Sequence, residues 1–311
     1  MKCNSVLCIC FQQTLYGVAL HFRTGAVDLI DRLKCDPIMR RICGWETKSS
    51  IPSEATFSRD FAEFSKTGLA SRAQETFINK YHSDRLIGHI ARDATAIEGR
   101  EKAIAKPKAM KPKNKKRGRP KKGEERPAPD PTRLERQTNM TLAEMLADLP
   151  TQCDIGTKKN SKGYQESWKG YKLHIDTADG DIPISALLTS ASVHDSQVAL
   201  PLAKITRARV SYCYELMDAA YDAKIIRDDS ASCGHVALID FNRRSPNDTR
   251  EFAPHEAIRY KERSSAERVN SNLKDNFGGR FVRVRGHAKV LCHLMFGLLA
   301  LTIDQTVRLL I

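Results

Sequence analysis

The sequence of 311 residues lacks the patterns that mark export, membrane insertion or a structural zinc site. Its start carries one lysine and an apolar stretch interrupted by Gln12 and Gln13, which does not match a signal peptide. The longest apolar run, residues 290–303, is too short to span a bilayer. The nine cysteines are odd in number and include no C-x-x-C pair, a usage typical of a reduced cytosolic chain. We therefore expect a cytoplasmic protein that makes no contact with a membrane.

Acidic residues are also absent from one long segment, which carries most of the positive charge. Residues 102–123 contain eleven lysines and arginines and no acid, so they supply +11 of the formal net charge of +14. A lysine- and proline-rich segment of this kind is expected to be extended when free. Its charge favours a polyanion as the partner of the protein.

The centre of this segment resembles an AT-hook. Residues Arg117-Gly118-Arg119-Pro120 match the pattern in which two arginines enter a narrow, A·T-rich minor groove and a glycine permits close approach. A polybasic linker that binds phosphates of any sequence is the alternative. Both interpretations make Arg117 and Arg119 candidate DNA-binding residues.

Apolar periodicity predicts a helical start followed by a mixed α/β region. Short helices between residues 26 and 81 are compatible with a helix-turn-helix that binds DNA, and equally with a helical cap on the next domain. Alternation with a period near two predicts a first strand at 86–98. The later patterns predict, in order, a loop at 156–170, strands at 171–176 and 182–190, a helix from Asp195, a strand at 214–218, a helix at 223–230, a strand at 235–240 and two final helices. This order is typical of a mixed sheet flanked by helices.

These patterns divide the chain into three parts. We expect residues 1–85 to form a helical N-terminal region that is a candidate for DNA binding. Residues 86–99 together with 168–311 form the α/β domain. Residues 100–167 form an insertion that contains the basic linker and a short helix.

One predicted helix, at residues 260–274, presents an unusual combination of side chains on one face. Spacings of three, four and seven residues bring a phenol, two cations and a carboxylate within a sector of roughly 60°. The four residues are Tyr260, Arg263, Glu267 and Lys274. Taken alone, this face is explained by a solvated helix surface with an Arg263–Glu267 ion pair.

Two aspartates give Glu267 a second interpretation. Asp93 lies inside the first strand, where an acid is unfavourable unless it has a partner or a metal. Asp218 ends a later strand, which is where open α/β sheets place their ligand sites. If the two strands are neighbours, both carboxylates cannot stay ionised and close without a cation. A pair of Mg²⁺ ions about 4 Å apart would relieve this repulsion and would suit cleavage and transfer of phosphodiesters.

The helix face and both aspartates resemble a known family. The four residues of the helix face match the Tyr-Arg-Glu-Lys signature of bacterial insertion-sequence transposases of the DDE type, which have a ribonuclease H-like fold. The similarity extends over residues 51–296. Other similar stretches are 92–95, 168–174, 188–195 and 217–222.

The resemblance implies a mixed sheet of the ribonuclease H-like type and a set of residue roles. The counterparts of Asp93, Asp218 and Glu267 bind two catalytic Mg²⁺ ions, with Mn²⁺ as a substitute. The counterparts of three further residues contact DNA near the cleaved bond: Tyr260, Arg263 and Lys274. Such an enzyme acts in the bacterial cytoplasm, at the nucleoid. It hydrolyses double-stranded DNA at the terminal inverted repeats and joins the new 3′ hydroxyl to target DNA, as a homodimer that holds two ends.

Two other functions agree with the same residues. A catalytically silent DNA-binding relic would act through its basic arm and helical region. A stand-alone metal-dependent nuclease would cleave DNA without joining the products. Cleavage and joining assays distinguish the three.

Overall fold

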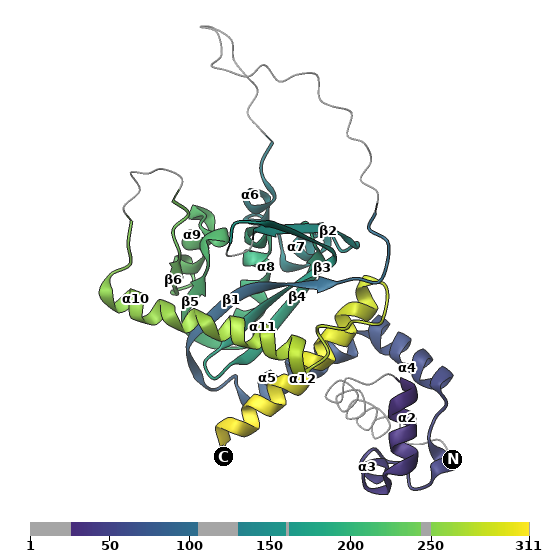
Figure 1. Cartoon of the computed structure of the whole chain (residues 1–311). Helices are drawn as coiled ribbons and strands as arrows, with labels where there is room; N and C mark the ends of the chain where they lie inside the picture. The colour runs from purple at the N-terminus through teal and green to yellow at the C-terminus, as the bar shows by residue number, and fades with distance from the viewer. Residues whose placement is uncertain (1–25, 105–129, 160–161, 244–249, 311) are drawn as a thin grey trace, which may run out of the picture.

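A six-stranded mixed sheet organises the part of the chain that the computed structural model describes, residues 26–104, 130–159, 162–243 and 250–310 (Figure 1). Its strands are β1 (Leu86–Glu98), β2 (Asp154–Lys159), β3 (Gln165–Ala178), β4 (Ile182–Ser190), β5 (Ser211–Met217) and β6 (Val236–Ile239). The strand order is β2-β3-β1-β5-β6, and β4 pairs with β3. β1, β5 and β6 run parallel, whereas β3 is antiparallel to β1, β2 and β4. The predicted mixed sheet with flanking helices is thus confirmed.

Helices precede the sheet and lie on both of its faces. The α-helices are α2 (Ala26–Cys35), α3 (Pro37–Ile42), α4 (Glu54–Thr67), α5 (Leu69–Tyr81), α6 (Arg133–Gln137), α7 (Leu142–Asp148), α8 (Ala199–Arg207), α9 (Lys224–Ser232), α10 (Pro254–Tyr260), α11 (Ser264–Asn276) and α12 (His287–Leu310). The 3₁₀ turns are η1 (Lys48–Ser50), η2 (Asp195–Val198), η3 (Ala219–Tyr221) and η4 (Lys261–Arg263). Helix α11 contacts β1 and β3, and α8 contacts β3 and β4 from the other side (Figure 1).

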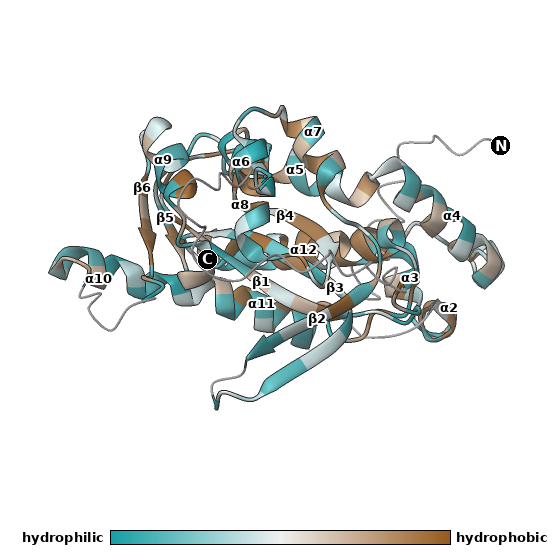
Figure 2. Ribbon diagram, turned by 90° about the horizontal axis from the view of Figure 1, so that it is seen from above, coloured by the Kyte–Doolittle hydropathy of each residue, from teal (hydrophilic) through white to brown (hydrophobic). Residues whose placement is uncertain are grey.

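The predicted loop at residues 156–170 is wrong. These residues form most of β2 and the first part of β3, which pair as an antiparallel hairpin. The stretch is polar, so it carries no hydrophobic alternation from which a strand could be predicted, and its outer end is hydrophilic in Figure 2. Gly170 lies at φ +151, and a Cβ there would stand 2.1 Å from the carbonyl oxygen of Ile97. Only glycine lets β3 pass this close to β1.

The predicted helix at residues 260–274 is helical throughout, but it contains a 3₁₀ turn. α10 ends at Tyr260, the 3₁₀ turn η4 follows, and α11 begins at Ser264. A 3₁₀ turn has three residues per turn, so Tyr260 and Arg263 stand one above the other instead of being offset as in an α-helix.

The main hydrophobic core lies between the sheet and α12. Ile97, Leu173 and Ile175 from the strands pack with α12, which contributes Leu294 and Leu298. In Figure 2, hydrophobic colours gather on the central strands and on α12. By length and composition α12 could cross a membrane, but 56% of its apolar window is buried inside the molecule, as in the core helix of a globular protein.

The helices before the sheet are attached to this core. Phe64 of α4 belongs to the same hydrophobic cluster as α12, and its ring centroid lies 6.4 Å from that of Phe296. Gly68, at φ +63, ends α4 and begins α5 in a left-handed conformation. α2 and α3 have a separate cluster around Leu33 and Phe57. The packing of α4 and α5 agrees with the predicted cap on the sheet domain.

Candidate active site

Two parallel strands bring Asp93 and Asp218 to the same level of the sheet. Arg92 of β1 is paired with Met217 of β5, so the next residue along each strand is one of the two aspartates. Successive side chains of a strand alternate between faces, so Asp93 points to the face opposite Arg92. Asp218 comes directly after β5 and caps η3, where its carboxylate accepts from the backbone N–H of Ala220 at 3.0 Å. β1 and β5 are thus neighbours, which is the condition on which the metal interpretation of the two aspartates depends.

Both carboxyl groups show the electrostatic consequence of this placement. Burial raises the pKa of Asp93 to about 6, and the negative charges of Asp218 and Asp195 act in the same direction. The backbone N–H of Ala94 and the guanidinium of Arg263 act in the opposite direction and lower this pKa. Burial also raises the pKa of Asp218, and Asp195 contributes in the same direction. The pair is a partly buried site whose negative charge Arg263 compensates only in part, which favours a bound cation.

Helix α11 covers this site closely. Ala266, which is 1% exposed, packs on Ala91 and Leu216, and these small or aliphatic side chains let the helix approach the sheet. One turn further on, Asn270 donates from Nδ2 to Oδ2 of Asp93 at 3.0 Å. The Asn270 Oδ1 atom is buried without a hydrogen-bond partner. Asn270 was not predicted as a site residue, because an asparagine on a polar helix gives no signal until its neighbour across the fold is known.

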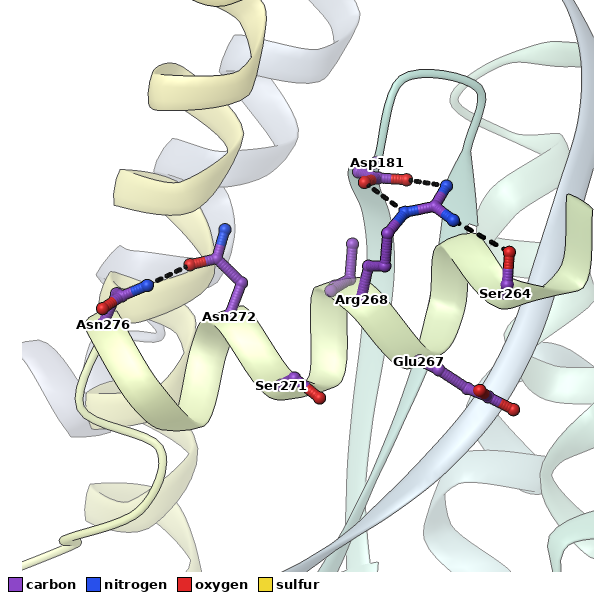
Figure 3. A pocket seen from close by; sticks show the side chains of 8 residues that line it. Asp181, Ser264, Glu267, Arg268, Ser271, Asn272 and Asn276 are labelled. Atoms are coloured by element: carbon purple, nitrogen blue, oxygen red, sulfur yellow. Dashed lines mark hydrogen bonds and ion pairs between the residues drawn. The ribbon is translucent and has the colours of Figure 1, made fainter.

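The Glu267 carboxylate is held in an ion pair by the guanidinium of Arg263. Arg263 Nη2 lies 2.5 Å from Glu267 Oε1, as the predicted i,i+4 ion pair requires. Burial opposes the charge of Arg263, but Tyr260, Glu267 and Asp93 together hold its pKa above the ordinary value. The Glu267 side chain is 58% exposed. Figure 3 shows it directed away from the ion pair that Arg268 makes with Asp181.

Tyr260 and Lys274, the other two residues of the predicted face, lie at its two ends. Tyr260 stacks against Phe252, with ring centroids 4.8 Å apart, and burial raises its pKa to about 12. Lys274 is half-buried, and its burial lowers the pKa of the ammonium group, as do the charges of Lys158 and Arg280. The structure thus brings Tyr260 to Arg263 and Glu267, and places Lys274 in a separate group of cations.

Asp195 is a fourth acid of the site that was not predicted to belong to it. It begins η2, and its carboxylate accepts from Lys172 Nζ at 2.9 Å. Its charge contributes to the raised pKa values of Asp93 and Asp218. The hydroxyl of Tyr221 is buried nearby without a hydrogen-bond partner. Burial is the largest cause that raises the pKa of this hydroxyl, and the charges of Asp195 and Asp93 raise it further. The similar stretch 188–195 could have pointed to Asp195, because that stretch ends on it.

A buried ion pair supports the sheet under the site. The guanidinium of Arg92 donates to both carboxylate oxygens of Asp176, at 2.7 and 2.8 Å. Glu215 of β5 lies 3.7 Å from the same guanidinium, and Thr206 of α8 donates to Asp176 at 2.6 Å. The side chains of Arg92, Asp176 and Glu215 thus join β1, β3 and β5 on the face of the sheet opposite Asp93.

The oxygen atoms at the site suit a hard divalent cation such as Mg²⁺. Asp93 and Asp218 fit this role by their position and because burial and neighbouring acids raise both of their pKa values. Among the residues that the structure describes, no three acids or other metal-binding side chains stand together as a ready metal site. Glu267 pairs with Arg263 instead, so it joins the aspartates only if that pair opens.

A mixed sheet with two facing aspartates under a helix that carries a glutamate is consistent with the ribonuclease H-like fold of transposases. Residues 84–303 match the family described as the transposase DDE domain. The match covers more than half of the chain, so the protein belongs to this family and is a transposase whose substrate is DNA. The family typically uses divalent metal ions. Comparisons with curated proteins and with solved structures gave no match.

Two of the predicted DNA-binding residues, Arg117 and Arg119, lie outside the described residues. The basic linker that contains them remains a prediction from the sequence.

Proposed function

We propose that this protein hydrolyses phosphodiester bonds at the ends of a bacterial insertion sequence and joins the freed strands to target DNA. The observation that carries the proposal is the pair Asp93 and Asp218 at one level of two parallel strands, beneath the helix that carries Glu267. In this proposal the protein acts on terminal inverted repeats as a homodimer, in the cytoplasm at the nucleoid. The residues Tyr260, Arg263, Glu267 and Lys274 then form its Tyr-Arg-Glu-Lys signature.

The proposed metal ligands are Asp93, Asp218 and Glu267. They would hold two Mg²⁺ ions, or Mn²⁺ in their place, and the metal would supply activation of the attacking oxygen and stabilisation of the leaving oxygen. Asn270 keeps the carboxylate of Asp93 in one orientation through its hydrogen bond. The burial of Asp93 limits the water that competes for its oxygens.

In this mechanism the Arg263–Glu267 pair holds both side chains until DNA binds. Without substrate, Arg263 neutralises Glu267 and lies near Asp93. A DNA phosphate competes with Glu267 for the guanidinium, because arginine forms charge-assisted, often bidentate pairs with phosphates as it does with carboxylates. Arg263 then turns to the phosphate, and Glu267 becomes free to turn to the aspartates. Tyr260 and Lys274, at the two ends of the face, contact the DNA on either side of the cleaved bond.

The proposal predicts that three conservative substitutions abolish cleavage. Asp93→Asn, Asp218→Asn and Glu267→Gln each keep the shape of the side chain and remove its charge. Cleavage of a duplex that carries the terminal repeat should fall by at least about a hundredfold with Mg²⁺ present. The matched control is Glu262→Gln in η4, an exposed acid of the same connection, which should cleave as the unaltered protein does.

Other outcomes of this assay identify the alternatives. Unchanged cleavage by Asp218→Asn or Glu267→Gln contradicts the proposed site. DNA binding without cleavage under Mg²⁺ or Mn²⁺ identifies a DNA-binding relic. Cleaved products that never join to a second DNA identify a stand-alone nuclease.

The basic linker predicts a second, separable contact with DNA. Replacing Arg117 and Arg119 with Ala should weaken binding to A·T-rich duplex selectively, because the two arginines depend on the potential of a narrow minor groove. The measurement is a titration of A·T-rich and G·C-rich duplexes of equal length at one salt concentration. An equal loss on both duplexes would make the segment a plain polybasic linker.

A further inference from the structure

A pocket at the end of β1 lies outside the site described above. It is formed by residues 98–100 and by residues 280–283, which join α11 to α12, and its volume is about 350 Å³. This volume is in the range of small-ligand sites, roughly 300 to 1,000 Å³. Three arginines line it, Arg100, Arg280 and Arg283, and Glu98 is the one acid among the lining residues.

The connecting segment presents an exposed aromatic ring to this pocket. Val282 is 5% exposed and Val284 packs against the main core, so the even-numbered residues of this extended segment face inward. Phe281, Arg283 and Arg285 alternate with them and face outward. Phe281 is 67% exposed. A phenylalanine at this position adds little to the core, so its ring is available to a ligand.

The charges around the ring favour an anion. Arg100 Nη1 donates to the carbonyl oxygen of Arg283 at 3.3 Å, which fixes the end of β1 to the connecting segment. Arg280 pairs with Asp275 at 2.5 Å, whereas Arg283 has no ion pair within the described residues. The pKa of Lys274 is lowered by burial and also by the charge of Arg280. The charge of Arg280 therefore acts on Lys274 of α11.

We propose that this pocket binds an unpaired nucleotide of a DNA strand, with the base stacked on Phe281 and its phosphates on Arg283 and Arg280. The faces of bases in a duplex are covered by their neighbours, whereas an unpaired base offers a free face to an aromatic ring. Arginines beside the ring neutralise the phosphates that such a base brings with it. This inference rests on the proposed function, in which DNA is cut and a strand end is released, and it names a subsite for that strand.

The test uses a duplex with a single-stranded extension that contains 2-aminopurine, whose fluorescence falls when the base stacks. The full-length protein is titrated without divalent metal, so that no cleavage occurs. Phe281→Ala should bind the extension about tenfold more weakly and should lose the quenching. Phe281→Trp should keep both, because it keeps the stacking surface. The control is Leu86→Ala, which removes a side chain that is 70% exposed at the other end of β1.

The arginines have a separate readout. Arg283→Ala should reduce the slope of log affinity against log salt by about 0.7, the value for one phosphate of a single strand. Lys224→Ala on α9 removes an exposed cation, with a side chain 85% exposed, and should leave the slope unchanged.

Two results would distinguish the failure of this inference from that of the proposed function. Equal affinity and equal quenching for Phe281→Ala and the unaltered protein overturn the pocket, even if cleavage depends on the three acids. Quenching that depends on Phe281, in a protein that does not cleave DNA under any metal, supports the pocket and overturns the proposed function.

Discussion

At the scale of single residues, Asp93 has the most informative surroundings. It is an acid within a strand, and its neighbours on all sides come from distant parts of the sequence: Asp218 from β5, Asp195 from η2 and Asn270 from α11. Two of these neighbours are acids that destabilise its charge, and one is an amide that donates a hydrogen bond to it. Of these three neighbours, Asn270 is therefore the one that orients the Asp93 carboxylate and carries no charge of its own.

The first prediction concerns Asn270. Asn270→Ala should weaken the binding of Mg²⁺ by about ten- to a hundredfold, because partners of metal ligands orient them and are worth that much in other proteins. Cleavage should fall at limiting Mg²⁺ and recover in part at high Mg²⁺. The measurement is cleavage rate against Mg²⁺ concentration, with Asn272→Ala as control, since Asn272 bonds Asn276 on the other side of the helix (Figure 3). A rate loss that Mg²⁺ does not restore would contradict this role.

At the scale of elements, β1 is fixed at two points. Its first part is held by Asp179, whose carboxylate accepts from the backbone N–H groups of Gly88 and His89 at 2.7 and 3.2 Å. Its middle is held by the buried pair of Arg92 and Asp176. A strand fixed in this way holds Asp93 at a constant position relative to β5.

The second prediction is a pH-dependent stability. Burial alone would raise the pKa of Asp179, but its hydrogen bonds with His89 and with the backbone of Gly88 lower it from 3.8 to about 2. A carboxyl whose folded pKa is depressed stabilises the protein above the unfolded value, and this contribution is lost as the pH falls from about 4 to about 2. Asp179→Asn should therefore lower the free energy of unfolding by about 1–2 kcal/mol at neutral pH and by less in acid.

The measurement is urea denaturation of both proteins at about pH 7, 5, 3.5 and 2.5, where the difference between them should be the same at about pH 7 and 5 and should shrink below about pH 4. The control Asp304→Asn removes a partner of Arg308 in an exposed ion pair of α12, and it should have almost no effect at any pH. A difference for Asp179→Asn that stays constant over this range would show that its charge is not the cause.

At the scale of the whole molecule, α12 joins the sheet to the helices that precede it. It packs on β4 and α5, and its Phe296 meets Phe64 of α4. A helix that shares one core with both parts makes them stabilise each other. We therefore expect residues 54–81 and the sheet to unfold in one transition.

The third prediction tests this coupling. Phe296 is 1% exposed, and Phe296→Ala should lower the free energy of unfolding by about 3–5 kcal/mol through lost burial and a cavity. The exposed Phe281→Ala is the matched control, and it should change stability by less than about 0.5 kcal/mol. With Trp168 of β3 replaced by Phe, Trp45 is the one tryptophan left, and it packs on Phe57. Its fluorescence and circular dichroism should then report the same midpoint in each protein. Separate midpoints would show that the helical region unfolds on its own.

The pattern of apolar residues was sufficient to predict most elements of the sheet, including the strands that carry Asp93 and Asp218. It failed at the hairpin of residues 156–170, because those side chains face solvent and show no alternation. It also failed at η4, because the choice between a 3₁₀ turn and a continuous α-helix depends on how α11 packs against β1, which is not a local property.

The sequence by itself indicated the family through the resemblance of its motifs, and it determined the Arg263–Glu267 pair, because an i,i+4 contact follows from local helix geometry. Only the tertiary structure decided that Asp93 and Asp218 stand at one level, that Asn270 and Asp195 join them, and that Phe281 lies among arginines. The physical reason is that local periodicity fixes which face a side chain occupies within its own element. Strand register and helix packing fix which side chains from other elements share that face.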